Sequence, residues 1–324
     1  MVEDYPRTLI DLEARFSNED SCREYLFSVR WPEGFVCPHC GRTGAWRTAR
    51  GLWVCRACRT QVSVTAGTIF QHSRLPLRIW FRAMWQIASQ KHGISALGLQ
   101  RALGLGSYRT AWLMLHKLRR AMVRPGRERL SGTIEVGVTS WGGDETPAGE
   151  SALIAIAAEA APGRERAIGR VRLRRIPDLE RAALHSFIRD SVEPGSTVVT
   201  DDREGYVGLP DYRHEPHVLR SSRAGEAHLL PRAHQVASLL RRWLMGTHHG
   251  AIAHEHIDDY LNEFVFRFNR RWSSPRGRLF LRLVQQTVVV KPVPYKAVKR
   301  AKRKDKVEVC AYLTRSFDNE SRRR

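Results

Sequence analysis

The sequence predicts a multidomain α/β protein, and three observations support that prediction. Two Cys-x-x-Cys pairs near the N-terminus indicate a zinc ribbon. The apolar residues change from helical to alternating periodicity after residue 130, and a basic run lies near the C-terminus. The 324 residues suffice for two or three domains. We expect a helix and zinc ribbon over 1–70, a helical, helix-turn-helix-like unit over 71–126, an α/β domain over 131–290 and a flexible basic tail over 291–324.

The net charge is the most unusual feature of the composition. Lysine and arginine number 54 against 33 aspartate and glutamate, a formal charge of +21. Such an excess repels itself unless a polyanion neutralises it, so nucleic acid is the expected partner. An anionic membrane is the alternative, but no apolar run reaches the roughly 18 residues of a spanning helix. The N-terminal residues also differ from a signal peptide, so we expect a cytoplasmic protein.

The cysteine pairs follow a stretch, residues 8–30, whose apolar spacing predicts a helix. Cys37 and Cys40 form the first pair, Cys55 and Cys58 the second, with 14 residues between the pairs. Two such knuckles joined by a short hairpin predict a structural zinc ion held by four thiolates. Buried free cysteines or redox motifs are the alternative, which two pairs at this spacing disfavour. His39 is a further nitrogen ligand candidate, although four cysteines already complete the shell.

Arginines surround the predicted zinc ligands. A DNA-contacting ribbon and a purely structural ribbon both fit this pattern. The arginines concerned are Arg42, Arg47, Arg50, Arg56 and Arg59.

Residues 75–124 predict three helices. The first begins near Pro76, the second covers residues 95–103, and Ser107 is suited to cap the third after a glycine-containing turn. Two short helices joined by such a turn are typical of a helix-turn-helix, whose second helix enters the DNA major groove. An ordinary three-helix packing unit is the alternative. The residues expected to face DNA are Arg101, Tyr108, Arg109, His116, Lys117 and Arg120.

The central segment alternates strands and helices. Strands are expected over 133–139 and 152–158, a third carries Arg170, Arg172 and Arg174 on one face, and a fourth ends at Asp201. Helices are expected from Pro177 and over 228–244. This order matches a ribonuclease H-like α/β fold, in which carboxylates of the first and fourth strands meet over two metal ions.

The fourth strand ends in two adjacent carboxylates, Asp201 and Asp202. By themselves such residues cap a loop as often as they bind a metal. Gly205 follows in a polar, turn-like stretch, where glycine can adopt a backbone conformation closed to other residues.

Several ordered motifs resemble the insertion-sequence transposases of the zinc-ribbon, ISXO-like group. The resemblance covers roughly residues 8–285. The motifs are residues 26–40 (LFSVRWPEGFVCPHC), 110–112 (TAW), 200–206 (TDDREGY), 228–234 (HLLPRAH), 242–248 (RWLMGTH) and 260–271 (YLNEFVFRFNRR).

The resemblance implies a DDE-type catalytic site that uses Mg or Mn. Asp201 matches the second catalytic aspartate, His234 the third catalytic position, and Arg241 a basic position seven residues further on. Gly137 stands where the family has its first catalytic aspartate. Glu135 lies on the same strand face and is a candidate substitute, as are Asp144 and Glu145 in the next loop. Impaired chemistry is the stronger expectation.

The C-terminal segment predicts helices over residues 257–268 and 278–286, then a basic tail. Residues 296–304 and 322–324 are rich in lysine and arginine, which is typical of non-specific binding to polyanions.

The leading hypothesis is therefore a DNA transposase that binds the ends of its element and catalyses cleavage and strand transfer. The resemblance implies double-stranded DNA as partner, a homodimer or larger assembly, and a prokaryotic, nucleoid-associated location. Arg56 and Arg242 join the candidate DNA contacts. The rival is a catalytically inactive or repurposed DNA-binding protein of transposase descent, which Gly137 favours. A zinc-ribbon transcription accessory factor is a third possibility that the central domain does not support.

Overall fold

The computed structural model of the chain divides into two compact units, which are described separately. The first comprises Met1–Gly126 and Trp272–Arg300, and the second comprises Arg127–Arg271 with the C-terminal residues.

The structure describes residues 4–124, 126–142, 151–217, 230–250, 252–273, 275–295 and 298. The predicted basic runs at 296–304 and 322–324 therefore lie outside the described residues, apart from Val298. Asp144, Glu145 and the predicted helix start at 228 lie outside them too.

The predicted helix over residues 8–30 is in fact two helices. Helix α1 spans Leu9–Arg15 and α2 spans Glu19–Arg30. Asn18 separates them in an extended conformation, where its side-chain oxygen accepts a hydrogen bond from the Ser21 amide at 2.9 Å. Asparagine is among the best residues at this capping position, so it starts a second helix instead of continuing the first.

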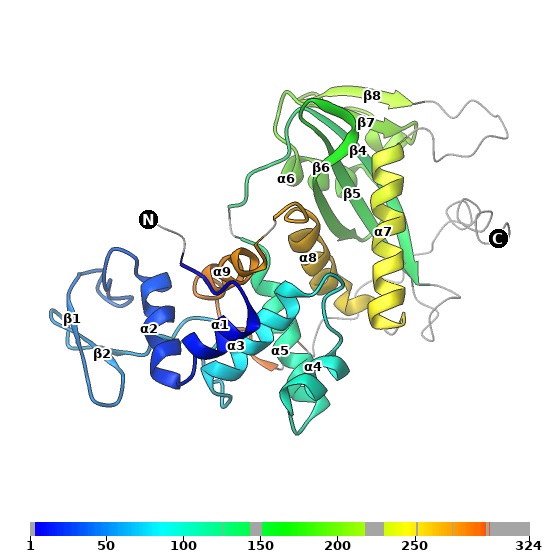
Figure 1. Cartoon of the computed structure of the whole chain (residues 1–324). Coiled ribbons are helices and arrows are strands. Elements are labelled where there is room, and N and C mark those ends of the chain that lie inside the picture. The colour runs from blue at the N-terminus through cyan, green and yellow to red at the C-terminus, as the bar shows by residue number, and fades with distance from the viewer. Residues whose placement is uncertain are drawn as a thin grey trace. The chain divides into compact units, whose positions relative to one another are not determined.

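A small antiparallel sheet follows α2 (Figure 1). Strands β1, β2 and β3 lie in that order, with Trp46 opposite Val54 and Val54 opposite Gln61. Their bounds are Ala45–Arg47, Trp53–Cys55 and Gln61–Val62. Such short strands cannot bury a core of their own, so another source of stability is needed.

The helical part of the first unit contains the three predicted helices and a fourth from far along the chain. They are α3 (Leu77–Ser89), α4 (Ala96–Leu103), α5 (Tyr108–Ala121) and α9 (Arg276–Thr287). Helix α9 packs on α3, and its Phe280 ring lies 5.8 Å from that of Phe81 and 6.0 Å from that of Trp85. Residues 276–287 therefore belong to the first compact unit in this structure, whereas the sequence analysis expected the α/β domain to extend to residue 290.

The second unit is a mixed sheet with helices on both faces (Figure 1). The strand order is β6-β5-β4-β7-β8; β4, β5 and β6 pair antiparallel, whereas β7 and β8 continue the sheet in parallel. The strands are β4 (Thr133–Gly142), β5 (Ser151–Ala161), β6 (Arg164–Ile176), β7 (Thr197–Asp201) and β8 (Arg213–His217). Strand β8 was not predicted, since it is polar, mostly exposed and contains Pro216.

Helices cover this sheet with two separate apolar cores. Val199 and Ile154 face the core built with α7 and α8, whereas Val198 and Ala155 face the core built with α6. The helices are α6 (Arg181–Ser191), α7 (Pro231–His248) and α8 (Ile257–Phe268), with short 3-10 turns η1 (Glu204–Tyr206) and η3 (His254–His256). Within the described residues, no helix combines the length and apolarity needed to cross a membrane.

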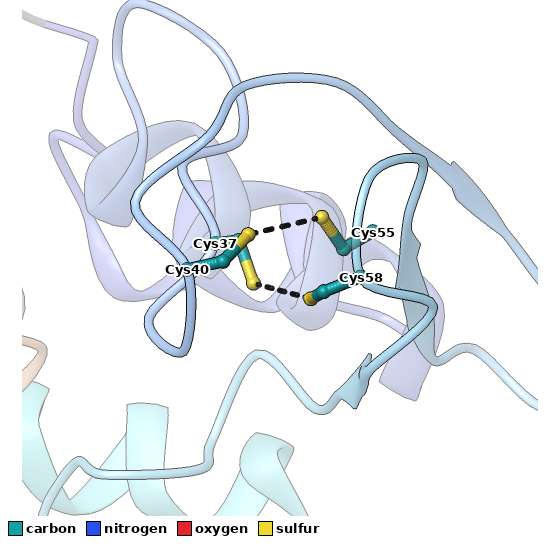
Figure 2. A group of neighbouring side chains, drawn as sticks. All are labelled: Cys37, Cys40, Cys55 and Cys58. Atoms are coloured by element: carbon teal, nitrogen blue, oxygen red, sulfur yellow. Dashed lines mark hydrogen bonds between the residues drawn. The ribbon is translucent and has the colours of Figure 1, made fainter.

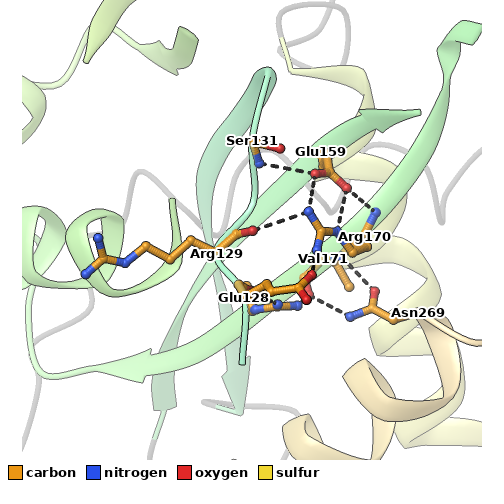
Figure 3. A network of polar contacts seen from close by, with 8 residues as sticks. Glu128, Arg129, Ser131, Glu159, Arg170, Val171 and Asn269 are labelled. Carbon is orange, nitrogen blue, oxygen red and sulfur yellow. Dashed lines mark hydrogen bonds and ion pairs between the residues drawn. The ribbon is translucent and has the colours of Figure 1, made fainter. Parts of the chain in front are cut away.

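Arg170, one of the arginines predicted on one face of the third strand, stabilises the fold through a polar network (Figure 3). Arg170 donates from Nε and Nη2 to the Glu159 carboxylate at 3.0 and 2.8 Å, and Arg172 is buried. Burial alone would raise the pKa of Glu159, but the hydrogen bonds from Arg170 outweigh burial and lower it. The Asn269 amide pairs with both backbone groups of Val171, at 2.7 and 3.1 Å, much as a neighbouring strand would.

Candidate functional site

The four predicted zinc ligands converge on one point (Figure 2). The sulfurs of Cys37 and Cys58 lie 3.7 Å apart, as do those of Cys40 and Cys55. A tetrahedral zinc ion with Zn–S bonds of about 2.3 Å places its sulfurs about 3.8 Å apart. The cysteine cluster thus has the size of a four-thiolate zinc site, and His39 is not part of it.

Both cysteine knuckles end with a residue in the left-handed backbone region. In the first, the Gly41 amide donates to the Cys37 carbonyl at 2.9 Å, with φ of 71° at Gly41. In the second, the Arg59 amide donates to the Cys55 carbonyl at 3.1 Å, with φ of 60° at Arg59. The two cysteine knuckles therefore have the same turn, although only the first has the glycine that this conformation favours.

Cys58 of the cluster differs in its pKa from the isolated Cys22. Hydrogen bonding by the Thr60 hydroxyl and backbone lowers the pKa of Cys58 to about 5. Burial raises the pKa of Cys22, on α2, to about 12. A thiolate is the form that binds zinc, so Cys58 is suited to a metal and Cys22 remains a neutral core thiol.

Asp201 lies at the C-terminal end of β7, next to the strand that carries Gly137. Strands β4 and β7 pair in parallel, with Glu135 opposite Val199. Continuing that register by two residues places Gly137 level with Asp201. A Cβ atom at Gly137 would lie 3.5 Å from Ala233 Cβ and 3.6 Å from Leu230 Cδ1, which is ordinary van der Waals contact. The backbone therefore has room for a side chain at the position where the resemblance predicts the first catalytic carboxylate.

Glu135 serves as the N-terminal cap of helix α7. Pro231 is the first helical residue and has no N–H, and Leu230 provides no side-chain cap. Glu135 Oε2 accepts from the next two amides, Arg232 at 2.6 Å and Ala233 at 3.0 Å. Its Oε1 accepts from the Arg232 guanidinium at 2.5 Å, and the residue is only 3% exposed. Both carboxylate oxygens are therefore already hydrogen-bonded.

Asp201 is ion-paired as well. Its Oδ2 lies 3.1 Å from Arg203 Nε, and its Oδ1 accepts from the Arg203 amide at 3.4 Å. Among the described residues, the groups of three or more ligand atoms within 4.8 Å do not include Asp201, Glu135 or His234. Two catalytic divalent cations need many hard oxygen donors. Of the predicted carboxylates that the structure describes, Glu135 caps a helix and Asp201 is paired with Arg203, so these described donors do not form a site for two such cations.

The remaining predicted catalytic residues lie on α7. His234 and Arg241 are half-buried and two helical turns apart, which places them on the same side of the helix. Arg242 is exposed.

Gly205 has a different role from the one predicted. A Cβ atom there would lie 2.6 Å from the Leu179 carbonyl oxygen and 2.8 Å from Leu184 Cδ1. Its φ is not among the positive values of the chain. Glycine is needed because the η1 turn packs directly on the start of α6, and not because of an unusual backbone conformation.

The predicted DNA-reading helix α5 exposes only its first turn. Tyr108 is 52% exposed, and Arg109 is exposed with its guanidinium carbon 5.5 Å from the centre of the Tyr295 ring. His116, by contrast, is fully buried, and the half-buried Lys117 ammonium donates to the Ile69 carbonyl at 3.3 Å. Burial also lowers the pKa of Lys117. His116 and Lys117 therefore lie outside the exposed first turn of α5.

The other predicted DNA contacts differ in exposure. Arg101 on α4 and Arg56 in the ribbon are exposed, whereas Arg120 is half-buried. Gly104 ends α4 in the left-handed conformation, as a turn between two short helices requires. The helix-turn-helix interpretation thus depends on the turn and the first residues of α5.

Two protein-family models match this chain. Residues 17–61, which contain all four clustered cysteines, match the transposase zinc-ribbon domain. Residues 130–269, from just before β4 to Asn269 after α8, match the ISXO2-like transposase domain. The two matches together span more than half of the chain.

One curated relative is similar over a shorter stretch. An uncharacterized protein in transposable element ISH50 of Halobacterium salinarum is 29% identical over 126 residues. That stretch is 37% of this chain and 41% of the relative, so the match spans less than half of either protein.

Proposed function

This chain belongs to the zinc-ribbon, ISXO2-like insertion-sequence transposases, and we propose that it binds the DNA of its element with an impaired strand-cleaving site. The observation that supports impairment is that Glu135 caps helix α7. Gly137 removes the first expected carboxylate, and the nearest substitute on the same strand face caps α7. Restoring the carboxylate at position 137 is the test.

The proposal includes a ribonuclease H-like fold for the second unit. What supports it is the strand order, because β4 and β7, the first and fourth strands of that unit, are direct neighbours. A carboxylate at the end of β7 and one at the same level within β4 would face one another across a single strand spacing of about 4.8 Å. One of the two positions is Asp201 and the other is Gly137.

DNA binding is the second part of the proposal. The formal charge of +21 supports it, as does a helix-turn-helix whose second helix exposes Tyr108 and Arg109 at its N-terminal end. In helix-turn-helix proteins the N-terminal residues of this helix contact base edges. An assembly of two or more copies belongs to the proposal because two element ends must be joined.

We expect Arg109→Ala to weaken binding to the element's own end sequence by about 1–3 kcal/mol, because a base-edge contact is lost. Binding to an unrelated duplex of equal length should change much less. Arg82→Ala is a charge-matched control, because Arg82 lies on α3 and pairs with Glu13 at 3.2 Å. Titration of both duplexes at fixed salt measures the effect. Equal losses on both would contradict base reading by α5.

Gly137→Asp should create metal-dependent DNA cleavage that the natural protein lacks. The new carboxylate would stand level with Asp201, and its Cβ has room against α7. The assay incubates full-length protein with Mg or Mn and a DNA fragment that carries the element's ends. Gly137→Asn is the matched control, because it adds a side chain of the same shape without the charge, and Asp201→Ala should abolish the gained activity.

The competing function is an active transposase that obtains its missing ligand elsewhere. Family membership and Asp201 at the strand end favour it. Cleavage by the natural protein that disappears in Asp201→Ala would establish this alternative and refute the impaired site.

A further inference from the structure

Arg59 occupies a backbone position that other side chains avoid. It follows the second knuckle as Gly41 follows the first, with the same type of amide-to-carbonyl bond and φ of 60°. The left-handed region brings Cβ close to the following carbonyl oxygen, which disfavours every residue with a side chain except asparagine and aspartate. Glycine would suit this turn, as it does at position 41. An arginine kept in a strained position indicates that its side chain has a use.

The Arg59 side chain lies over an exposed aromatic ring. Its guanidinium carbon is 5.2 Å from the centre of the Trp46 ring, and Trp46 on β1 is 38% exposed. The ring holds the cation by a cation–π interaction and limits its rotamer freedom. The strained turn and the exposed tryptophan together hold the Arg59 guanidinium on the surface in a restricted position.

No acidic group neutralises this cation within the part of the chain that the structure describes. No carboxylate oxygen there lies within the 4.0 Å of an ion pair from Arg59. The neighbouring Arg47, on the same strand as Trp46, is instead paired with Asp20 at 2.7 Å and with Glu24 at 3.1 Å. Arg59 therefore retains its guanidinium donors for an external anion, whereas Arg47 does not.

We infer that the Arg59–Trp46 pair contacts a backbone phosphate of bound DNA. The inference depends on the proposed DNA binding and gives the ribbon a role separate from that of α5. A planar guanidinium suits phosphate oxygens, and stacking reduces the entropy lost when the contact forms. A phosphate contact positions the protein on the duplex without reading its sequence.

The test compares Arg59→Gly with the natural full-length protein. Dissociation constants are measured for the element's end duplex and an unrelated duplex across a potassium chloride series. Removing one phosphate contact should weaken both complexes by a similar factor, about 3- to 10-fold, and lower the slope of log K against log salt by about 0.9. Arg59→Lys should restore the slope but not the full affinity, since lysine keeps the charge and loses the planar stack.

Zinc content and thermal unfolding of Arg59→Gly provide the second readout. Zinc should be retained and the unfolding temperature should not fall, because glycine suits φ of 60°. His72→Gly is the backbone-matched control, since His72 also has a positive φ, 58°, but lies outside the ribbon strands. Arg82→Ala is the charge-matched control. Neither control should change the salt slope by as much as Arg59→Gly.

The outcomes separate this inference from the proposed function. If the natural protein binds neither duplex, both fail. If it binds and Arg59→Gly binds with equal affinity and slope, the phosphate contact is refuted while DNA binding stands. Loss of zinc in Arg59→Gly would assign Arg59 to the metal site instead, and a loss confined to the element's own ends would indicate base reading. Either result overturns the inference.

Discussion

Cys55→Ser is expected to abolish stoichiometric zinc binding and to unfold the ribbon of β1, β2 and β3. The sheet is too small to be stable alone, so metal binding supplies its folding free energy, on the order of 10–16 kcal/mol in zinc-finger peptides. Cys55 is fully buried with its sulfur 3.7 Å from that of Cys40. A serine oxygen replaces a soft thiolate with a poor zinc ligand. Metal analysis of freshly purified protein measures the stoichiometry.

Cys22→Ser is the matched control for this prediction. Cys22 is also fully buried, but it lies on α2 outside the cluster of four cysteines. Its substitution should leave one zinc per chain. Hydrogen exchange should show lost protection of the ribbon amides in Cys55→Ser alone. A Cys55→Ser protein with full zinc content and a protected ribbon would disprove the structural role of the metal.

Glu135→Ala is expected to destabilise the second unit by about 3–5 kcal/mol, the range for removing one partner of a buried ion pair. The substitution leaves the Arg232 and Ala233 amides at the start of α7 without their carboxylate acceptor. It also removes the carboxylate that pairs with the Arg232 guanidinium. Hydrogen exchange of peptides from α7, with peptides from α3 as an internal reference, measures the loss within the intact chain.

Two further variants separate the cap from a metal ligand. Glu135→Gln keeps an oxygen acceptor for the amides and loses the charge, so its loss of stability should be smaller than that of Glu135→Ala. Glu193→Ala removes an exposed carboxylate of the same unit and should change stability by no more than about 0.5 kcal/mol. If Glu135→Ala leaves the α7 amides fully protected, Glu135 is not a cap and becomes available as a substitute ligand.

Features that depend on neighbours along the chain were predictable from the sequence. The spacing of the four cysteines predicts their cluster, because each pair is joined by a tight turn. Alternation and apolar runs predict β4, β5 and β7 within a few residues, and Gly104 and Ser107 separate α4 from α5. The same reasoning missed the break at Asn18, whose capping hydrogen bond divides a continuous apolar pattern into two helices.

Features that depend on distant partners were decided only by the tertiary structure. Glu135 is an alternating strand residue in the sequence, and only the approach of α7, nearly one hundred residues later, makes it a cap. The sequence predicts Lys117 on a DNA-facing surface, whereas in the structure its ammonium donates a hydrogen bond to the Ile69 carbonyl. Gly205 is constrained by the Leu179 carbonyl oxygen, which lies far from it in the sequence. Helix α9 follows the sheet unit in the chain but packs with α3. The sequence thus determined most local elements and the thiolate cluster, because turns, caps and periodicity act over a few residues. Packing decided the hydrogen-bond partners of the remaining polar groups, because hydrogen bonds and burial join residues that lie far apart in the sequence.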